Sequence, residues 1–193
     1  AFEMREEGLT EVANLSETLI EEMSESAEGS AATAIYEGTR PLILEIQALT
    51  SPASAGFPRR PSVGIDHNRL NMILAVLERR AGISLAAQDV YLNIIGGLPL
   101  DAPAADLAAV VAIASSYLDK PVPNGMAAVG EVGLSGEIRS VSHMEQRLSE
   151  VKRLGFTQCI IPAHHAVDLR ERSSLELLPV RNISEALRLL AQA

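Results

Sequence analysis

The apolar run that begins at Leu107 constrains the fold of this chain more than any other feature. Eight residues without a polar side chain, from Leu107 to Ala114, follow Asp106. They predict a helix over residues 105–117 that is apolar nearly all round, and such a helix belongs at the centre of a layered fold. A short loop with glycines and two prolines joins it to an apolar strand at 90–95. A junction of this kind often holds a nucleophile or an anion, because a helix N-terminus offers free N–H groups.

Strands and helices are mixed through the rest of the chain, with several strands early on, which indicates the α+β class. Asp66 and Asn182 are expected to cap the N-termini of helices, and Ser142 with Glu145 has the spacing of a capping box. Gly82 is expected to end the helix that Asp66 begins. We expect strands at 31–37, 41–50, 61–65, 90–95, 126–132, 157–161 and 175–180, and helices at 67–80, 105–117, 143–154, 165–170 and 183–191.

Length and composition limit the class of protein. A chain of 193 residues forms one domain, or one domain with an appendage. The single cysteine, Cys159, excludes an internal disulfide and a multi-cysteine zinc site. No apolar run reaches the roughly 18–20 residues that a membrane span needs, and the acidic N-terminus does not resemble a signal peptide. We therefore expect a cytoplasmic protein without a membrane partner.

Charge is distributed unevenly along the chain. The net charge of −9 argues against nucleic acid as a partner when it is taken alone. Residues 1–28 hold nine acids and one base, which gives −8, whereas the remaining 165 residues hold 15 bases and 16 acids, which gives −1. An acidic leader, with one weak helix expected at 14–23, therefore precedes a nearly neutral body.

Two stretches resemble the proteolytic domain of the Lon family. One is the loop and helix start Pro103-Ala104-Ala105-Asp106, and the other is the segment Glu131–Arg139 with its Gly-Leu-Ser-Gly turn. In active Lon the loop carries a nucleophilic serine and the helix after the turn carries a lysine. Those positions fall on Ala104 and Glu145 here, and Asp106 stands where active members have a glycine. A Ser–Lys dyad needs a hydroxyl and an amine of lowered pKa, and neither is present.

The same degenerate pattern resembles the C-terminal domain of the RadA (Sms) family of bacterial DNA repair proteins. Further matching motifs lie at 38–42, 58–60, 68–70 and 75–82. The resemblance implies a Lon protease domain fold, similar to ribosomal protein S5 domain 2, over residues 31–193. It implies that residues 1–30 are an acidic linker from an upstream ATPase domain. ATP, Mg²⁺ and zinc would belong to upstream domains, and no cofactor is expected in this chain.

Three functions follow from this resemblance. The first is a non-catalytic scaffold that supports a hexameric ring, with DNA as a partner, single-stranded DNA included, and a RecA-type recombinase as a further partner. In the family, the full-length protein would be a DNA-dependent ATPase that moves recombination intermediates. The second function is an active Lon-type serine peptidase, against which Ala104 argues directly. The third is a protein-binding module that recruits recombination factors.

The most basic part of the body lies between residues 57 and 80. Five arginines against Asp66 and Glu78 give it a net charge of +3. Arginine pairs well with phosphate, so a DNA contact is one interpretation. A subunit interface that pairs with acids on a neighbour is another, and a solvated surface is the third. Only Phe57 adds an aromatic ring, which gives little support to base stacking. The five arginines are Arg59, Arg60, Arg69, Arg79 and Arg80.

Histidines and serines offer weaker candidates. His165 and Asp168 could share a helical face beside His164, but adjacent histidines on an exposed turn are usually surface residues, and we expect no metal site. His143 lies next to the vestigial lysine position and is not expected to do chemistry. A relocated peptidase dyad is not expected either. Ser115 and Ser116 have no base nearby in the sequence, Ser135 lies in a turn, and Ser142 is expected to serve as a helix cap. The serines and the base considered are Ser115, Ser116, Ser135, Ser140, Ser142 and Lys152.

Overall fold

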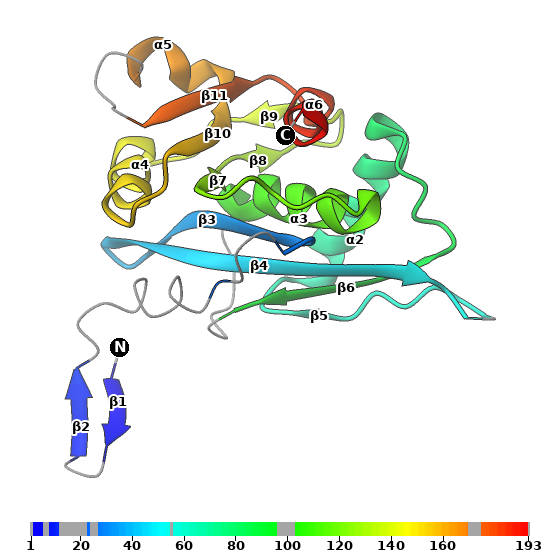
Figure 1. The fold of residues 1–193 in the computed structure, drawn as a ribbon, viewed down its shortest axis with the longest axis horizontal. Helices are drawn as coiled ribbons and strands as arrows, with labels where there is room; N and C mark the ends of the chain where they lie inside the picture. The colour runs from blue at the N-terminus through cyan, green and yellow to red at the C-terminus, as the bar shows by residue number, and fades with distance from the viewer. Residues whose placement is uncertain are drawn as a thin grey trace.

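A seven-stranded mixed sheet forms the middle of the molecule (Figure 1). The computed structural model describes residues 2–5, 8–11, 23, 27–54, 56–95, 103–169 and 175–192. The strand order is β11-β10-β7-β3-β4-β6-β5, and four of the six neighbouring pairs are parallel. The strands are β3 (Ser30–Glu37), β4 (Arg40–Pro52), β5 (Ser62–Val63), β6 (Gln88–Ile94), β7 (Met126–Ala128), β10 (Gln158–Pro162) and β11 (Glu176–Val180).

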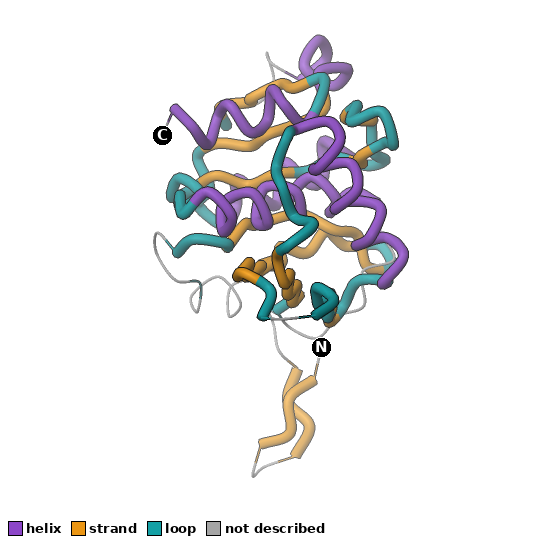
Figure 2. The backbone as a smooth tube through the Cα atoms, turned by 90° about the vertical axis from the view of Figure 1, so that its right-hand side faces the viewer, coloured by secondary structure: helices purple, strands orange, loops and turns teal. Residues whose placement is uncertain are grey.

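Helices pack against this sheet. Figure 2 draws the helices in purple and the strands in orange. The long helices are α2 (His67–Val76), α3 (Asp106–Leu118), α4 (Met144–Arg153) and α6 (Ile183–Gln192), and α5 (Ala166–Leu169) is short. A π-helical segment, η1 (Leu77–Ala81), continues α2, and the 3-10 turns η2 (Pro103–Ala105) and η3 (Ala163–His165) precede α3 and α5. None of the helices in the described part of the chain is both long enough and apolar enough to cross a membrane.

Helix α3 is the central helix that the apolar run predicts. Ten of its thirteen residues, from Asp106 to Ser115, are buried. Ser115 fixes the helix to the sheet, because its Oγ accepts a hydrogen bond from Gly29 N–H at 2.9 Å. Ser116 does the same for β4, since its Oγ accepts from Thr50 N–H at 2.9 Å. Both serines therefore have structural partners inside the fold.

The sheet separates two apolar clusters. Ala31, Leu44 and Ile46 belong to the cluster that α2, α3 and α6 cover, whereas Ala34 and Ile43 belong to the cluster under α4 and α5. Alternate side chains of a strand point to opposite faces of its sheet, so the two groups of helices lie on opposite faces. This layering confirms the α+β mixture that the sequence predicts.

Several predicted elements differ in detail. The expected strand 126–132 divides into β7 and β8 (Glu131–Val132), and β8 pairs with β9 (Ile138–Arg139) in a separate two-stranded sheet. The leader holds an unpredicted hairpin, β1 (Phe2–Arg5) with β2 (Gly8–Glu11), drawn apart from the body in both views. The weak helix expected at 14–23 falls almost wholly outside the described residues.

The expected capping box of Ser142 and Glu145 is wrong. Helix α4 begins at Met144, and its N-cap is His143, which adopts a left-handed conformation (φ 57°, ψ 35°) and makes no side-chain capping hydrogen bond. By contrast, Asp66 caps α2 through Arg69 N–H at 3.0 Å, and Gly82 ends η1 with φ 71°, both as predicted.

Candidate functional site

The start of α3 is where the sequence predicts a vestigial catalytic loop. Ala104 lies in η2 and is 3% exposed, and the preceding residues 96–102 lie outside the described part of the chain. Gly130 holds this junction from both sides: its N–H donates to Ala104 O at 2.9 Å, and its carbonyl accepts from Leu107 N–H at 3.1 Å. A Cβ at Gly130 would come within 2.8 Å of Ile138 Cγ2, so the close approach requires glycine.

A methionine, rather than the residue at the lysine position, shares a cluster with Ala104. Met144 is 4% exposed and belongs to the same apolar cluster as Ala104, together with Leu148. Glu145, at the position where the Lon resemblance expects a lysine, is exposed on α4. Consequently, the structure surrounds the serine position with apolar side chains and leaves the lysine position at the surface.

Asp106, which the Lon resemblance places at a glycine position, is used inside the fold. It is 2% exposed, and its carboxylate accepts hydrogen bonds from Arg69 Nε at 2.9 Å and from Val132 N–H at 3.0 Å. A second nitrogen of Arg69, Nη2, also bonds to the carboxylate, so the pair is bidentate. One carboxylate thus ties α2, α3 and β8 together beside the vestigial site.

Burial and hydrogen bonding shift the pKa of the Asp106 carboxyl group in opposite directions. Burial raises the pKa of Asp106 above its ordinary value, while the hydrogen bonds from Arg69 and Val132 N–H limit that rise. The hydrogen bond to Asp106 raises the pKa of Arg69. Arg69 is therefore a charged partner at every physiological pH.

A second buried arginine lies on α4. Arg147 is 4% exposed, and it donates to Ala34 O at 2.5 Å and to Ser142 O at 2.9 Å. Its guanidinium carbon lies 5.4 Å from the centre of the Tyr36 ring, and that ring stacks on His143 at 4.6 Å. Burial lowers the pKa of Arg147. These contacts hold α4 against the end of β3, and no pattern in the sequence indicated them.

The structure divides the predicted basic region into two groups. Arg60 donates to Gln88 O and Leu85 O, both at 2.9 Å, and Arg69 pairs with Asp106. Arg59, Arg79 and Arg80 are exposed. Only these three keep the exposure that a phosphate contact requires, so the five arginines do not form one free patch.

The weaker candidates also have structural surroundings. Ser135 and Ser142 are exposed, and Lys152 is exposed on α4. His165 Nε2 accepts from Val141 N–H at 3.3 Å. Among the described residues, no three histidine, cysteine or acidic side chains gather as a metal site would require. Cys159 is fully buried, and burial raises its thiol pKa far above the ordinary value.

Comparisons with known proteins agree with these features. A family model described as the Lon protease (S16) C-terminal proteolytic domain matches residues 80–192. DNA repair protein RadA of Bacillus subtilis (strain 168) is 53% identical over 97% of this chain and 41% of its own length. The RadA proteins of Listeria monocytogenes and Streptococcus pneumoniae are 48% and 46% identical over 97% of this chain, and 41% and 44% of their own lengths. The chain thus spans less than half the length of these curated relatives.

Proposed function

The chain belongs to the family of the Lon protease C-terminal proteolytic domain, and from this premise we propose that it is a non-catalytic scaffold domain of a DNA repair protein. Ala104 carries the proposal. A methyl group stands at the nucleophile position, and it is buried with Met144 rather than beside a base. Acyl transfer needs a nucleophile within hydrogen-bond reach of its base, so this site is better suited to packing than to peptide cleavage.

The relatives named DNA repair protein RadA support a role in DNA repair. In that role the domain assembles copies of the chain into a ring, a hexamer in the longer protein, and adds a surface that contacts DNA. The ATPase activity, with its ATP, Mg²⁺ and zinc, and the RecA-type partner belong to the longer protein in this proposal.

Arg59, Arg79 and Arg80 are the proposed DNA contacts, because they are the exposed members of the basic region. Removing one arginine that binds a phosphate should lower the slope of log affinity against log salt by about 0.7–0.9. The acidic leader of net charge −8 opposes such binding most strongly at low salt.

Fluorescence anisotropy of labelled single- and double-stranded DNA across a salt series tests this surface. We expect the Arg79→Ala/Arg80→Ala and Arg59→Ala variants to bind more weakly than wild type and with a shallower salt slope. Arg153→Ala is the matched control, because Arg153 is paired with Glu150 on α4, and it should bind like wild type. Equal slopes in all four proteins would remove these arginines from the DNA surface.

A further inference from the structure

Phe57 is the most exposed large apolar side chain in the described part of the chain. It is 98% exposed, whereas Leu134 and Leu49 are 71% and 60% exposed. It lies in the loop that joins β4 to β5, and in Figure 1 this loop extends past the tip of the β4 arrow at the right-hand edge of the view. A single exposed apolar residue is ordinary on a protein surface. An aromatic ring with both faces uncovered can also stack on another flat ring, so the residues around it decide what it can bind.

Hydrogen bonds hold the backbone just after the ring. Arg59 N–H donates to the Asp89 carboxylate at 2.6 Å, and Val90 N–H donates to Arg59 O at 2.9 Å. The Arg60 guanidinium donates to two further backbone carbonyls, each at 2.9 Å. An aromatic side chain on a fixed backbone loses little freedom on binding, because it has only two rotatable side-chain bonds. Phe57 is therefore both exposed and held in place by the residues that follow it.

The charges around this loop leave one exposed cation beside the ring. Residues 52–62 contain no acid, and Arg59 and Arg60 are their only bases. Asp89 is 7% exposed, and its carboxylate already accepts Arg59 N–H. The exposed Glu78 accepts a backbone N–H at 3.0 Å from the same residue whose carbonyl binds Arg60, so this acid lies with Arg60. The Arg59 side chain is exposed and forms no ion pair with another residue of the described chain.

An exposed ring beside an exposed arginine suits single-stranded nucleic acid better than a protein surface. One phenylalanine buries roughly 150–250 Å², far below the roughly 800 Å² that each partner buries in a stable protein interface. Its neighbours Ser54 and Gly56 add little apolar area. A nucleobase needs only one ring to stack on, and its phosphate needs a cation. The Cα atoms of Phe57 and Arg59 are at most about 7 Å apart, so one nucleotide or two neighbouring ones can reach both.

We infer that Phe57 stacks on an unpaired base of single-stranded DNA while Arg59 binds a neighbouring phosphate. This inference rests on the proposed DNA contact of Arg59, and it adds the ring and the kind of strand to that contact. In a duplex each base is covered by its neighbours, and exposing it costs unstacking and unpairing energy. The ring should therefore contribute to the binding of single strands and not of duplexes, whereas Arg59 contributes to both.

Phe57→Ala tests the stacking contact by fluorescence anisotropy. We expect its affinity for labelled oligothymidylate to be lower than that of wild type by about five-fold or more, with an unchanged salt slope because no charge is removed. Its affinity for a duplex and for an abasic single strand of the same length should equal that of wild type. Phe57→Tyr keeps an aromatic ring and should restore binding. Leu134→Ala, at the exposed leucine between β8 and β9, is the matched control and should bind all three DNAs like wild type.

Phe57→Trp gives a second and more direct measurement. The chain contains no tryptophan, so the new side chain is the only indole, and stacking on a base should quench its fluorescence. We expect oligothymidylate to quench this emission and the abasic strand to bind without quenching it. Leu134→Trp is the control, and its emission should change with neither strand.

The outcomes separate this inference from the proposed function. If wild type binds single-stranded DNA while Phe57→Ala binds it equally well, or if the emission of Phe57→Trp does not change, the ring does not stack, and the proposed DNA surface still stands. A loss of affinity that is equal for single strand, duplex and abasic strand would also overturn the inference, since it would not depend on an unpaired base. A wild-type chain that binds none of these DNAs would contradict both the inference and the proposed DNA surface.

Discussion

Asp106, at a position where the Lon resemblance expects a glycine, is a group that must be paired when it is buried. Its carboxylate holds Arg69 of α2 and the N–H of Val132 on β8. Removing one member of a buried pair leaves the other uncompensated, which costs far more than the net contribution of the pair. The residue therefore stabilises the vestigial junction, and that junction depends on its partner.

We expect Arg69→Ala to lower the free energy of unfolding by about 2–4 kcal/mol, because Asp106 then stays buried without its cation. Without the guanidinium, the pKa of Asp106 rises further, so the folded variant binds a proton more tightly than the unfolded chain. Stability should then fall as pH rises above the ordinary aspartate pKa of about 4. Urea unfolding at several pH values measures this, and the deficit relative to wild type should be larger at pH 7 than near pH 4.

The double variant Arg69→Ala/Asp106→Ala is the control for this prediction. Without the carboxylate, no buried charge is left unpaired, so the double variant should be more stable at pH 7 than the sum of the two single changes implies. Additive effects of the two changes would show that Arg69 and Asp106 contribute independently.

Single-residue features were only partly predictable. Ala104 and Glu145 follow from motif spacing, and Asp106 was recognisable as a departure from the active pattern. The pairing of Asp106 with Arg69 could not be predicted. The two residues are 37 positions apart, and a single sequence does not indicate which distant opposite charges meet in the fold. The same limit applies to Arg147, whose backbone acceptor at Ala34 lies 113 residues away.

At the scale of elements, local sequence patterns predicted most helices and strands. They predicted the N-terminal caps of α2 and α6 correctly but not the cap of α4. Asn182 with Glu185 forms the predicted cap of α6: Asn182 Oδ1 accepts Glu185 N–H at 2.9 Å, and the Glu185 carboxylate accepts Arg181 N–H at 2.8 Å. Ser142 with Glu145 has the same spacing without this geometry. There His143 takes the cap position, and the Ser142 carbonyl accepts from the buried Arg147 instead. Tertiary contacts thus override the local pattern at α4.

We expect Asn182→Ala to destabilise the fold by about 1 kcal/mol, because the helix N-terminus of α6 loses its side-chain acceptor. Asn182→Asp should retain most of the stability, since a carboxylate can accept the same hydrogen bond. The midpoint of urea unfolding measures both. Equal stability of wild type and Asn182→Ala would show that the cap does not stabilise α6.

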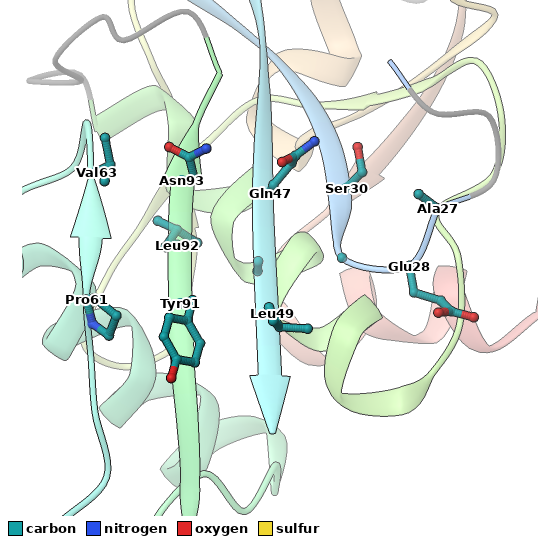
Figure 3. A pocket seen from close by; sticks show the side chains of 12 residues that line it. Ala27, Glu28, Ser30, Gln47, Leu49, Pro61, Val63, Tyr91, Leu92 and Asn93 are labelled. Carbon is teal, nitrogen blue, oxygen red and sulfur yellow. The ribbon is translucent and has the colours of Figure 1, made fainter. Parts of the chain in front are cut away.

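At the scale of the whole molecule, the Lon fold is present, with a buried alanine, Ala104, at the expected serine position and an exposed glutamate, Glu145, at the expected lysine position. A central apolar helix, a sheet with helices packed on both faces and a junction held by Gly130 remain. The class of the fold was predictable because the apolar run of α3 demands layers around it. The groove of about 360 Å³ over β4, β6 and β5 (Figure 3) was not predictable, because it depends on which part of a sheet face the described helices leave uncovered.

The central claim is that this domain works without peptide cleavage, and hydrolysis of casein or a fluorogenic peptide tests it most directly. We predict that wild type hydrolyses neither substrate faster than buffer alone does. We also predict none by Ala104→Ser/Glu145→Lys, because position 145 is exposed whereas position 104 is buried in the same apolar cluster as Met144. Wild-type turnover that is abolished by Ser135→Ala or Ser142→Ala would contradict the account and establish a relocated peptidase site.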